Sequence, residues 1–216
     1  MFGNSPLNFL RSGADHSLFV AIVLALVAGI TFHEFSHALV ATLQGDQTAR
    51  AQGRLTLNPL SHLDPLGSFA LIVAGFGWGR PVPFSPGQLR SRRVGAALVG
   101  LAGPAANLVL AIVAALLLRF SINNSESFTF KLLDVLFQFN VILCVFNLLP
   151  IPPLDGSRLL SVLLPPNRQQ IVYFLDQFGI FILLGIILLA PNLLGPVFRA
   201  LAQLILRLVG FPGPTF

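Results

Sequence analysis

Uncharged apolar runs of membrane-spanning length constrain this chain more than any other feature of its sequence. The first run covers residues 18–43 and is interrupted by the motif H-E-F-S-H at residues 33–37. About 20 apolar residues in a helix cross a bilayer core about 30 Å thick, so this run is long enough to span a membrane. Ionisable side chains are costly inside a span and require a functional reason.

The motif at residues 33–37 reads H-E-x-x-H, a pattern that places two zinc-binding histidines and a catalytic carboxylate on one helix. His33 and His37 are four residues apart, so on a helix they point the same way, one turn above the other. Glu34 lies beside them, within reach of a water on the metal. In soluble helices chance matches are common, and a buried histidine is more often a core residue than a ligand. Inside an apolar span an unpaired carboxylate is expensive, which favours a metal site.

Composition indicates the same class of protein. Hydrophobic residues make up 55% of the 216 residues and charged residues 10%, against about a quarter charged in soluble domains. The net charge of +5 is spread over loops, which indicates topology and contact with membrane lipid rather than nucleic-acid binding. The single cysteine, Cys144, lies in an apolar run and excludes both a disulfide framework and a cysteine metal site.

The expected fold is an all-α polytopic membrane protein with about five full transmembrane helices. The expected spans are residues 18–43, 94–118, 128–149, 171–190 and 197–209. Residues 66–77 are apolar but short and glycine-broken, so we expect a re-entrant or tilted segment. Residues 54–57 alternate like a short β-strand after the first helix. We divide the chain into a lead-in (1–17), a three-helix catalytic core (18–160) and a C-terminal helix pair (161–216).

A third metal ligand has to come from outside the motif, because catalytic zinc usually takes three protein ligands and keeps one position open. The candidates are Asp46, His62, Asp64, Asp134, Asp155 and Asp176. Asp155 is favoured because it lies in a Pro-Pro-Leu-Asp-Gly turn after a span, where irregular backbone is tolerated only in protein or beside a cavity. His62 and Asp64 remain alternatives, with turn formation and capping as their ordinary explanation.

The order of the spans also favours Asp155. If residues 66–77 do not cross the membrane, the next two spans leave and return to the side where the first span ends, which brings Asp155 to the histidines. The same topology collects most of the loop arginines on that side: Arg50, Arg54, Arg80, Arg90, Arg92, Arg93, Arg158 and Arg168. Only Arg119 and Lys131 remain among the loop charges opposite. The positive-inside rule then makes the side of the active site cytoplasmic.

Three motifs in order resemble the site-2 protease family of intramembrane zinc metalloproteases: H-E-F-S-H at 33–37, G-P-A-A-N at 103–107 and N-L-L-P-I-P-P-L-D-G at 147–156. Together they cover the three-helix core of that family. The loops at residues 57–67 and 78–83 are similar to those of short prokaryotic members. The chain leaves no room for the PDZ or CBS domain that larger members carry.

The resemblance implies a role for each motif. It implies one zinc ion held by His33, His37 and Asp155, with Glu34 as the catalytic base. It implies substrate binding by Asn107, Asn147 and Pro153. The expected partner is a transmembrane protein substrate, and the expected location is a prokaryotic cell membrane. Two alternatives are a zinc-binding transporter, for which no repeat symmetry is evident, and an inactive scaffold, which would be expected to lose a motif residue.

Overall fold

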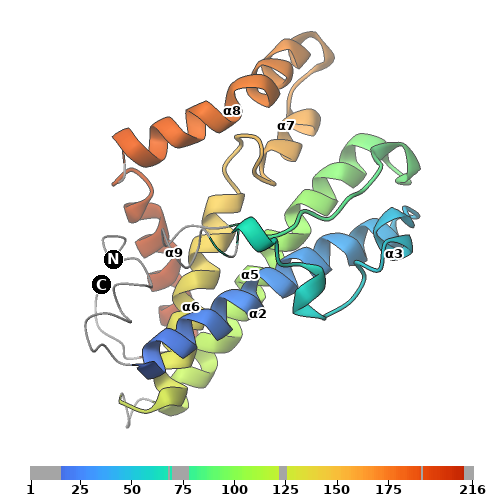
Figure 1. Ribbon diagram of the computed structural model, residues 1–216. Coiled ribbons are helices and arrows are strands. Elements are labelled where there is room, and N and C mark those ends of the chain that lie inside the picture. Colours follow the sequence, from blue (N-terminus) through green and yellow to red (C-terminus); the bar gives the residue numbers. More distant parts are fainter. Residues whose placement is uncertain (1–15, 68, 70–77, 122–125, 191, 212–216) are drawn as a thin grey trace.

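Three long helices form the centre of the protein, for which the computed structural model describes residues 16–67, 69, 78–121, 126–190 and 192–211. These helices are α2 (His16–Leu43), α5 (Arg92–Ser121) and α6 (Phe128–Asn147). Each packs against the other two, as the crossing ribbons in Figure 1 show. They correspond to the first, second and third expected spans.

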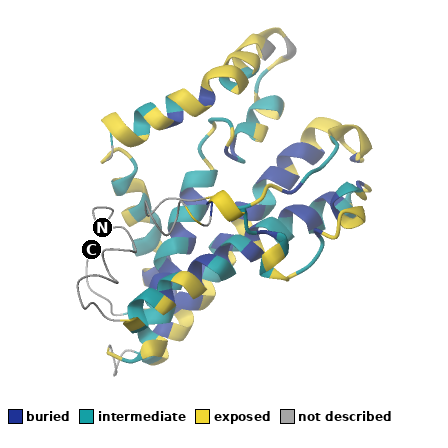
Figure 2. Ribbon diagram, viewed as in Figure 1, coloured by how far each residue is buried: buried dark blue, intermediate teal, exposed yellow. Residues whose placement is uncertain are grey.

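Small side chains allow the three helices to approach one another closely. The buried positions include Ala21 and Ala25 on α2 and Ala111 and Ala114 on α5, each fully buried. Figure 2 shows that buried residues gather between the helices, whereas their outer faces are exposed. Those outer faces carry large apolar side chains such as Leu116, as expected of surfaces that contact lipid.

Within the described part of the chain, four helices are long and apolar enough to cross a membrane: α2, α5, α6 and α8 (Gln169–Leu189). The fifth expected span, residues 197–209, is instead α9 (Gly195–Leu208). Its 14 residues make a helix about 21 Å long, which is shorter than a bilayer core. α9 buries Ile205 and Leu206 against α5 and α6, while Arg199 is exposed.

A tight turn joins α6 to α7 (Ser157–Leu163), and η3 (Pro166–Arg168) leads into α8. The Gly156 N–H donates to the carbonyl oxygen of Asn147 at 2.7 Å, which folds the turn back onto the end of α6. A Cβ atom at Gly156 would lie 2.3 Å from the Leu148 oxygen, so this close approach requires glycine. The turn contains a cis peptide bond between Pro152 and Pro153 and directs Asp155 toward α2.

The loops between α2 and α5 contain α3 (Thr48–Ala51), η1 (Pro59–Ser61) and η2 (Pro86–Gln88). The expected strand at 54–57 is wrong, because those residues form a bend, and the described residues contain only an isolated bridge between Leu63 and Gly79. A side chain already bonds one of the backbone groups that a ladder would need: the carbonyl of Thr56 accepts a hydrogen bond from His62 Nε2 at 2.7 Å. The apolar segment 66–77 lies mostly outside the described residues.

Candidate metal centre

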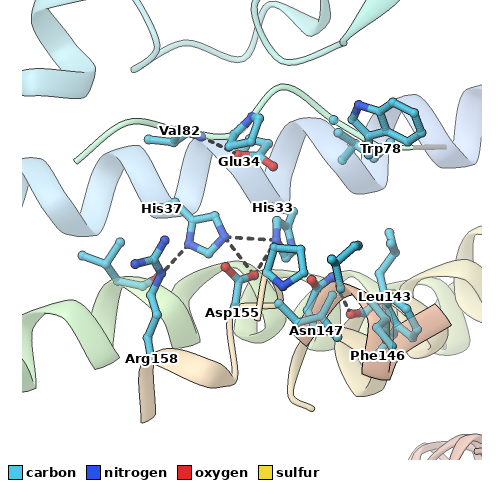
Figure 3. Close-up of a pocket in the computed structure, with 18 of the residues that line it drawn as sticks. His33, Glu34, His37, Trp78, Val82, Leu143, Phe146, Asn147, Asp155 and Arg158 are labelled. Atoms are coloured by element: carbon cyan, nitrogen blue, oxygen red, sulfur yellow. Dashed lines mark hydrogen bonds and ion pairs between the residues drawn. The ribbon is translucent and has the colours of Figure 1, made fainter. Parts of the chain in front are cut away.

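The side chains of His33, His37 and Asp155 converge at one point where α2, α5 and the turn before α7 meet (Figure 3). The two histidine Nε2 atoms are 3.0 Å apart, and they lie 3.0 Å and 3.2 Å from Asp155 Oδ2. Both histidines are buried, with exposed fractions of 7% and 6%. A tetrahedral zinc site with bonds of about 2.0–2.1 Å places ligand atoms about 3.3 Å apart, close to these separations.

The other ring nitrogen of each histidine contacts an oxygen that can only accept a hydrogen bond. His33 Nδ1 lies 2.6 Å from Asn107 Oδ1, and His37 Nδ1 lies 2.6 Å from the carbonyl oxygen of Val99. A neutral imidazole carries a single N–H, which both contacts place on Nδ1. Each Nε2 therefore presents a lone pair toward the other histidine and toward the carboxylate.

Three acceptor atoms that face one another repel unless a cation lies between them. The arrangement therefore suits a metal ion, and two nitrogen ligands with one oxygen ligand match a catalytic zinc site that keeps a position open. The residues present fit the metal.

Gly103 on α5 lets the histidine pair lie directly against that helix. A Cβ atom there would lie 2.5 Å from both His33 Cε1 and His37 Nε2, a separation that no ordinary contact allows. Pro104 follows it inside the helix and has no N–H to donate to the preceding turn. The G-P-A-A-N motif thus combines close helix approach with the Asn107 acceptor for His33.

Glu34 lies on the same cavity wall but outside the converging set. Its Oε2 accepts a hydrogen bond from the Val82 N–H at 3.1 Å, as Figure 3 shows. The segment that carries Val82 is tied down nearby, because the buried Arg54 guanidinium donates to the carbonyl oxygens of Arg80 and Pro81. The carboxylate is therefore held next to the ligands and separate from them.

The ligands and Glu34 face a cavity of about 600 Å³. Its walls are mostly apolar, and part of them comes from α8 through Ile180, Leu183, Leu184 and Ile187. Asn147 and Pro153 also line the cavity, whereas Asn107 does not and is fully buried behind His33. The expectation that Asn107 contacts substrate therefore does not match its position.

The side chains of the remaining candidate ligands interact with other groups, away from the two histidines. His62 is fully buried against the Thr56 carbonyl, and Asp64 accepts from the Gly67 N–H at 2.7 Å. The fully buried Asp46 accepts from the backbone of Thr48 and Ser85. Asp134 accepts from Gln138 at 2.8 Å, and Asp176 interacts electrostatically with Arg158.

Two further residues near the centre, Asn140 and Arg158, are not among the site residues predicted from the sequence. Asn140, on α6, is fully buried and accepts a hydrogen bond from Asn107 at 2.8 Å. Arg158, on α7, lines the cavity with its guanidinium 4.4 Å from the centre of the Phe84 ring. An amide inside an apolar span was a signal for Asn140, but nothing in the sequence placed Arg158 beside Phe84.

Comparisons with known proteins agree with this geometry. The profile described as Peptidase family M50 matches residues 121–190. The chain is 39% identical over 201 residues to "Putative zinc metalloprotease YwhC" of Bacillus subtilis, which covers 89% of this chain and 92% of that protein. It is 35% identical over 182 residues to "Putative zinc metalloprotease Rip2" of Mycolicibacterium smegmatis, covering 82% of this chain and 69% of that protein.

Rip2 of Mycobacterium tuberculosis is 33% identical over 185 residues, covering 82% of this chain and 70% of that protein. No solved structure is significantly similar to the chain. These relatives do not favour the transporter or scaffold alternatives. With four long apolar helices among its described residues, a buried His-His-Asp centre and relatives that span most of its length, the chain belongs to the site-2 protease family of intramembrane zinc metalloproteases.

Proposed function

We propose that the protein is a zinc-dependent endopeptidase that hydrolyses peptide bonds in or near membrane-spanning segments of other proteins. The observation that carries the proposal is the meeting of His33, His37 and Asp155 on the wall of an apolar cavity. These three residues would hold one zinc ion per chain. When bound, zinc supplies a Lewis acid that makes water more acidic and polarises a peptide carbonyl.

Glu34 is the proposed general base and acid. It takes a proton from the attacking water and delivers it to the leaving amine of the cleaved bond. We assign the proton to Oε1, because Oε2 already accepts from the Val82 N–H. That hydrogen bond holds the carboxylate in one orientation while the proton moves.

A membrane-spanning substrate has to unwind before it can react, because a helix keeps its carbonyl groups in internal hydrogen bonds. The cavity accepts an apolar peptide segment between α8 and the helices that carry the ligands. We assign Asn147 and Pro153 to substrate binding, since both line the cavity beside Asp155. Residues 18–160 contain every residue with an assigned chemical role, so we propose them as the catalytic core, with residues 161–216 completing the cavity.

A matched pair of variants tests the proposal, because the chain contains only two glutamates, Glu34 and Glu126. Glu34→Gln is expected to keep one zinc per chain and to lower cleavage of single-span substrates in lipid vesicles by about 10²–10⁴-fold. Glu126→Gln, at an exposed position far from the ligands in the chain, is expected to cleave like the wild type. Unchanged cleavage by Glu34→Gln would end the assignment.

A further inference from the structure

A chain of buried amides lies behind His33, on the side away from the cavity. Asn107 Oδ1 accepts from His33 Nδ1, and Asn107 Nδ2 donates to the carbonyl oxygen of Gly29 at 3.2 Å and to Asn140 Oδ1 at 2.8 Å. Asn140 Nδ2 in turn donates to the carbonyl oxygen of Leu136 at 2.8 Å. Both amides are fully buried, and their hydrogen bonds link α2, α5 and α6.

The two backbone carbonyl groups that end this row of amides, those of Gly29 and Leu136, determine the direction of every hydrogen bond in it. A carbonyl oxygen can only accept, so the Asn140 amide has to turn its NH₂ group toward Leu136 and its oxygen toward Asn107. Asn107 then has to turn its NH₂ group toward Asn140 and Gly29, and its oxygen toward His33. The His33 proton consequently lies on Nδ1, which leaves the Nε2 lone pair for the metal.

We propose that Asn140 is a positioning residue for the metal centre, acting through Asn107 to hold His33 in the tautomer that binds zinc. This inference rests on the proposed function, because it takes His33 Nε2 as a zinc ligand. Without Asn140, the Asn107 amide loses one of the two acceptors that fix its orientation. A flipped Asn107 would offer NH₂ to His33 and favour the tautomer with its proton on Nε2, which cannot bind a metal there.

His37 provides an internal reference for this effect. Its Nδ1 donates to the Val99 carbonyl, a backbone group with a fixed direction, and makes no contact with the amide chain. A change at Asn140 should therefore alter His33 and leave His37 unchanged. General loss of packing around the centre would disturb both rings, since they are only 4.6 Å apart.

The decisive variant is Asn140→Leu, which keeps the branching at Cγ and removes both the donor and the acceptor. Gln138→Leu is the matched control, because it makes the same kind of change on α6 at an amide that bonds Asp134 instead. Asn140→Asp is the rescue variant: a neutral carboxyl has the same shape, an acceptor for Asn107 and a donor for Leu136. Asn140→Ala replaces the leucine variant if the latter does not fold.

Two measurements are made on the full chain in detergent. Zinc titration is expected to give roughly 10- to 100-fold weaker binding for Asn140→Leu, and wild-type binding for Gln138→Leu. Nitrogen-15 labelling of histidine is practical because the chain has only four histidines. In the zinc-saturated protein, the His33 Nδ1–H resonance is expected to lose its protection from solvent exchange in Asn140→Leu, while that of His37 keeps it and Asn140→Asp restores most of the wild-type behaviour.

The outcomes separate this inference from the proposed function. If the wild type does not bind zinc, or if His37→Ala leaves zinc binding unchanged, the proposed ligands are wrong and the inference fails with them. If the wild type binds zinc, but a folded Asn140→Leu or Asn140→Ala protein keeps both its affinity and its His33 resonance, only the inference is overturned. Equal changes at His33 and His37, or no recovery in Asn140→Asp, would also overturn it. Asn140 would then contribute only packing and would not fix the orientation of the Asn107 amide.

Discussion

Asp155 differs from the other acidic residues of this chain in what surrounds its carboxylate. It lies in a turn that folds back on α6 and meets two buried imidazoles from another helix. Asp64 and Asp46 bind backbone N–H groups instead, as carboxylates in loops often do. Position in the fold, rather than residue type, therefore separates the expected ligand from its competitors.

Removing the expected third ligand tests this distinction at the level of single residues. Asp155→Ala should weaken zinc binding by more than the roughly 10- to 100-fold typical for loss of an outer hydrogen-bond partner, and abolish cleavage. His62→Ala and Asp64→Ala should keep most of the metal, because neither side chain faces the histidines. Zinc titration of the three purified variants decides the point. A zinc-binding Asp155→Ala protein together with loss of metal in either other variant would place the centre in the 58–65 loop.

The roles of individual site residues could be predicted from the sequence where those residues belong to a motif. The spacing of His33 and His37, the position of Glu34 and the turn that holds Asp155 all pointed to one site, and the structure brings them together. The role of Asn107 could not be predicted in this way. Its partner Asn140 is 33 residues away, and their contact depends on the relative rotation of α5 and α6 about their axes. No local pattern encodes that rotation.

Helix α5 has to pass close to α2 at Gly103 for the centre to form. The histidine rings of α2 occupy the space that a side chain at Gly103 would need. Glycine residues at such positions allow helix backbones to approach in lipid, where no hydrophobic driving force brings helices together. One methyl group on α5 therefore competes directly with the ligands.

Gly103→Ala should displace the histidines or move α5 away from α2. We expect at least about tenfold weaker zinc binding and a destabilisation of about 1–3 kcal/mol, typical of overpacking. Gly185→Ala is the control, because a Cβ atom at Gly185 on α8 meets nothing within 4 Å. Zinc titration and thermal unfolding of both variants give the comparison. Equal behaviour of the two variants would show that the close approach is not needed.

At the level of helices and strands, length and hydropathy predicted α2, α5, α6 and α8 because each is a long, nearly uncharged run. The span expected at residues 197–209 is instead the short helix α9, whose apolar residues lie on one face and bury Ile205 and Leu206 in the core. The short strand at 54–57 failed for another reason. Alternation alone provides no partner, and the carbonyl of Thr56 binds the His62 side chain.

Across the whole molecule, the loops after α2 and before α5 lie together. The Gln44 carbonyl accepts from the Arg90 N–H at 3.0 Å, and Asp46 accepts from the Ser85 N–H. Two loops joined by such bonds share one side of a membrane. By the positive-inside rule, the arginines of these loops and of the segment after α6 predict that this side is cytoplasmic.

Cysteine labelling tests this orientation in a Cys144→Ser background, which removes the only native thiol. Cysteines at the exposed positions Gln47 and Gln88 should both react from the cytoplasmic side of sealed vesicles. A cysteine at Glu126, in the loop between α5 and α6, should react from the opposite side. Labelling of Gln47 and Gln88 from different sides would contradict both the topology and the contact between the loops.

Because three acceptor atoms converge at the centre, the stability of the folded protein should also depend on the zinc concentration. Without metal, partial charges of the same sign face one another where α2, α5 and the turn before α7 meet. Zinc binding would replace that repulsion with attraction. Chelation should therefore lower the melting temperature, and zinc at 1,000 times its dissociation constant should stabilise the fold by about 4 kcal/mol. Thermal melts at graded zinc concentrations measure this, and a midpoint independent of zinc would contradict it. A cell short of zinc would then lose the protease by turnover of unfolded chains as well as by inactivity.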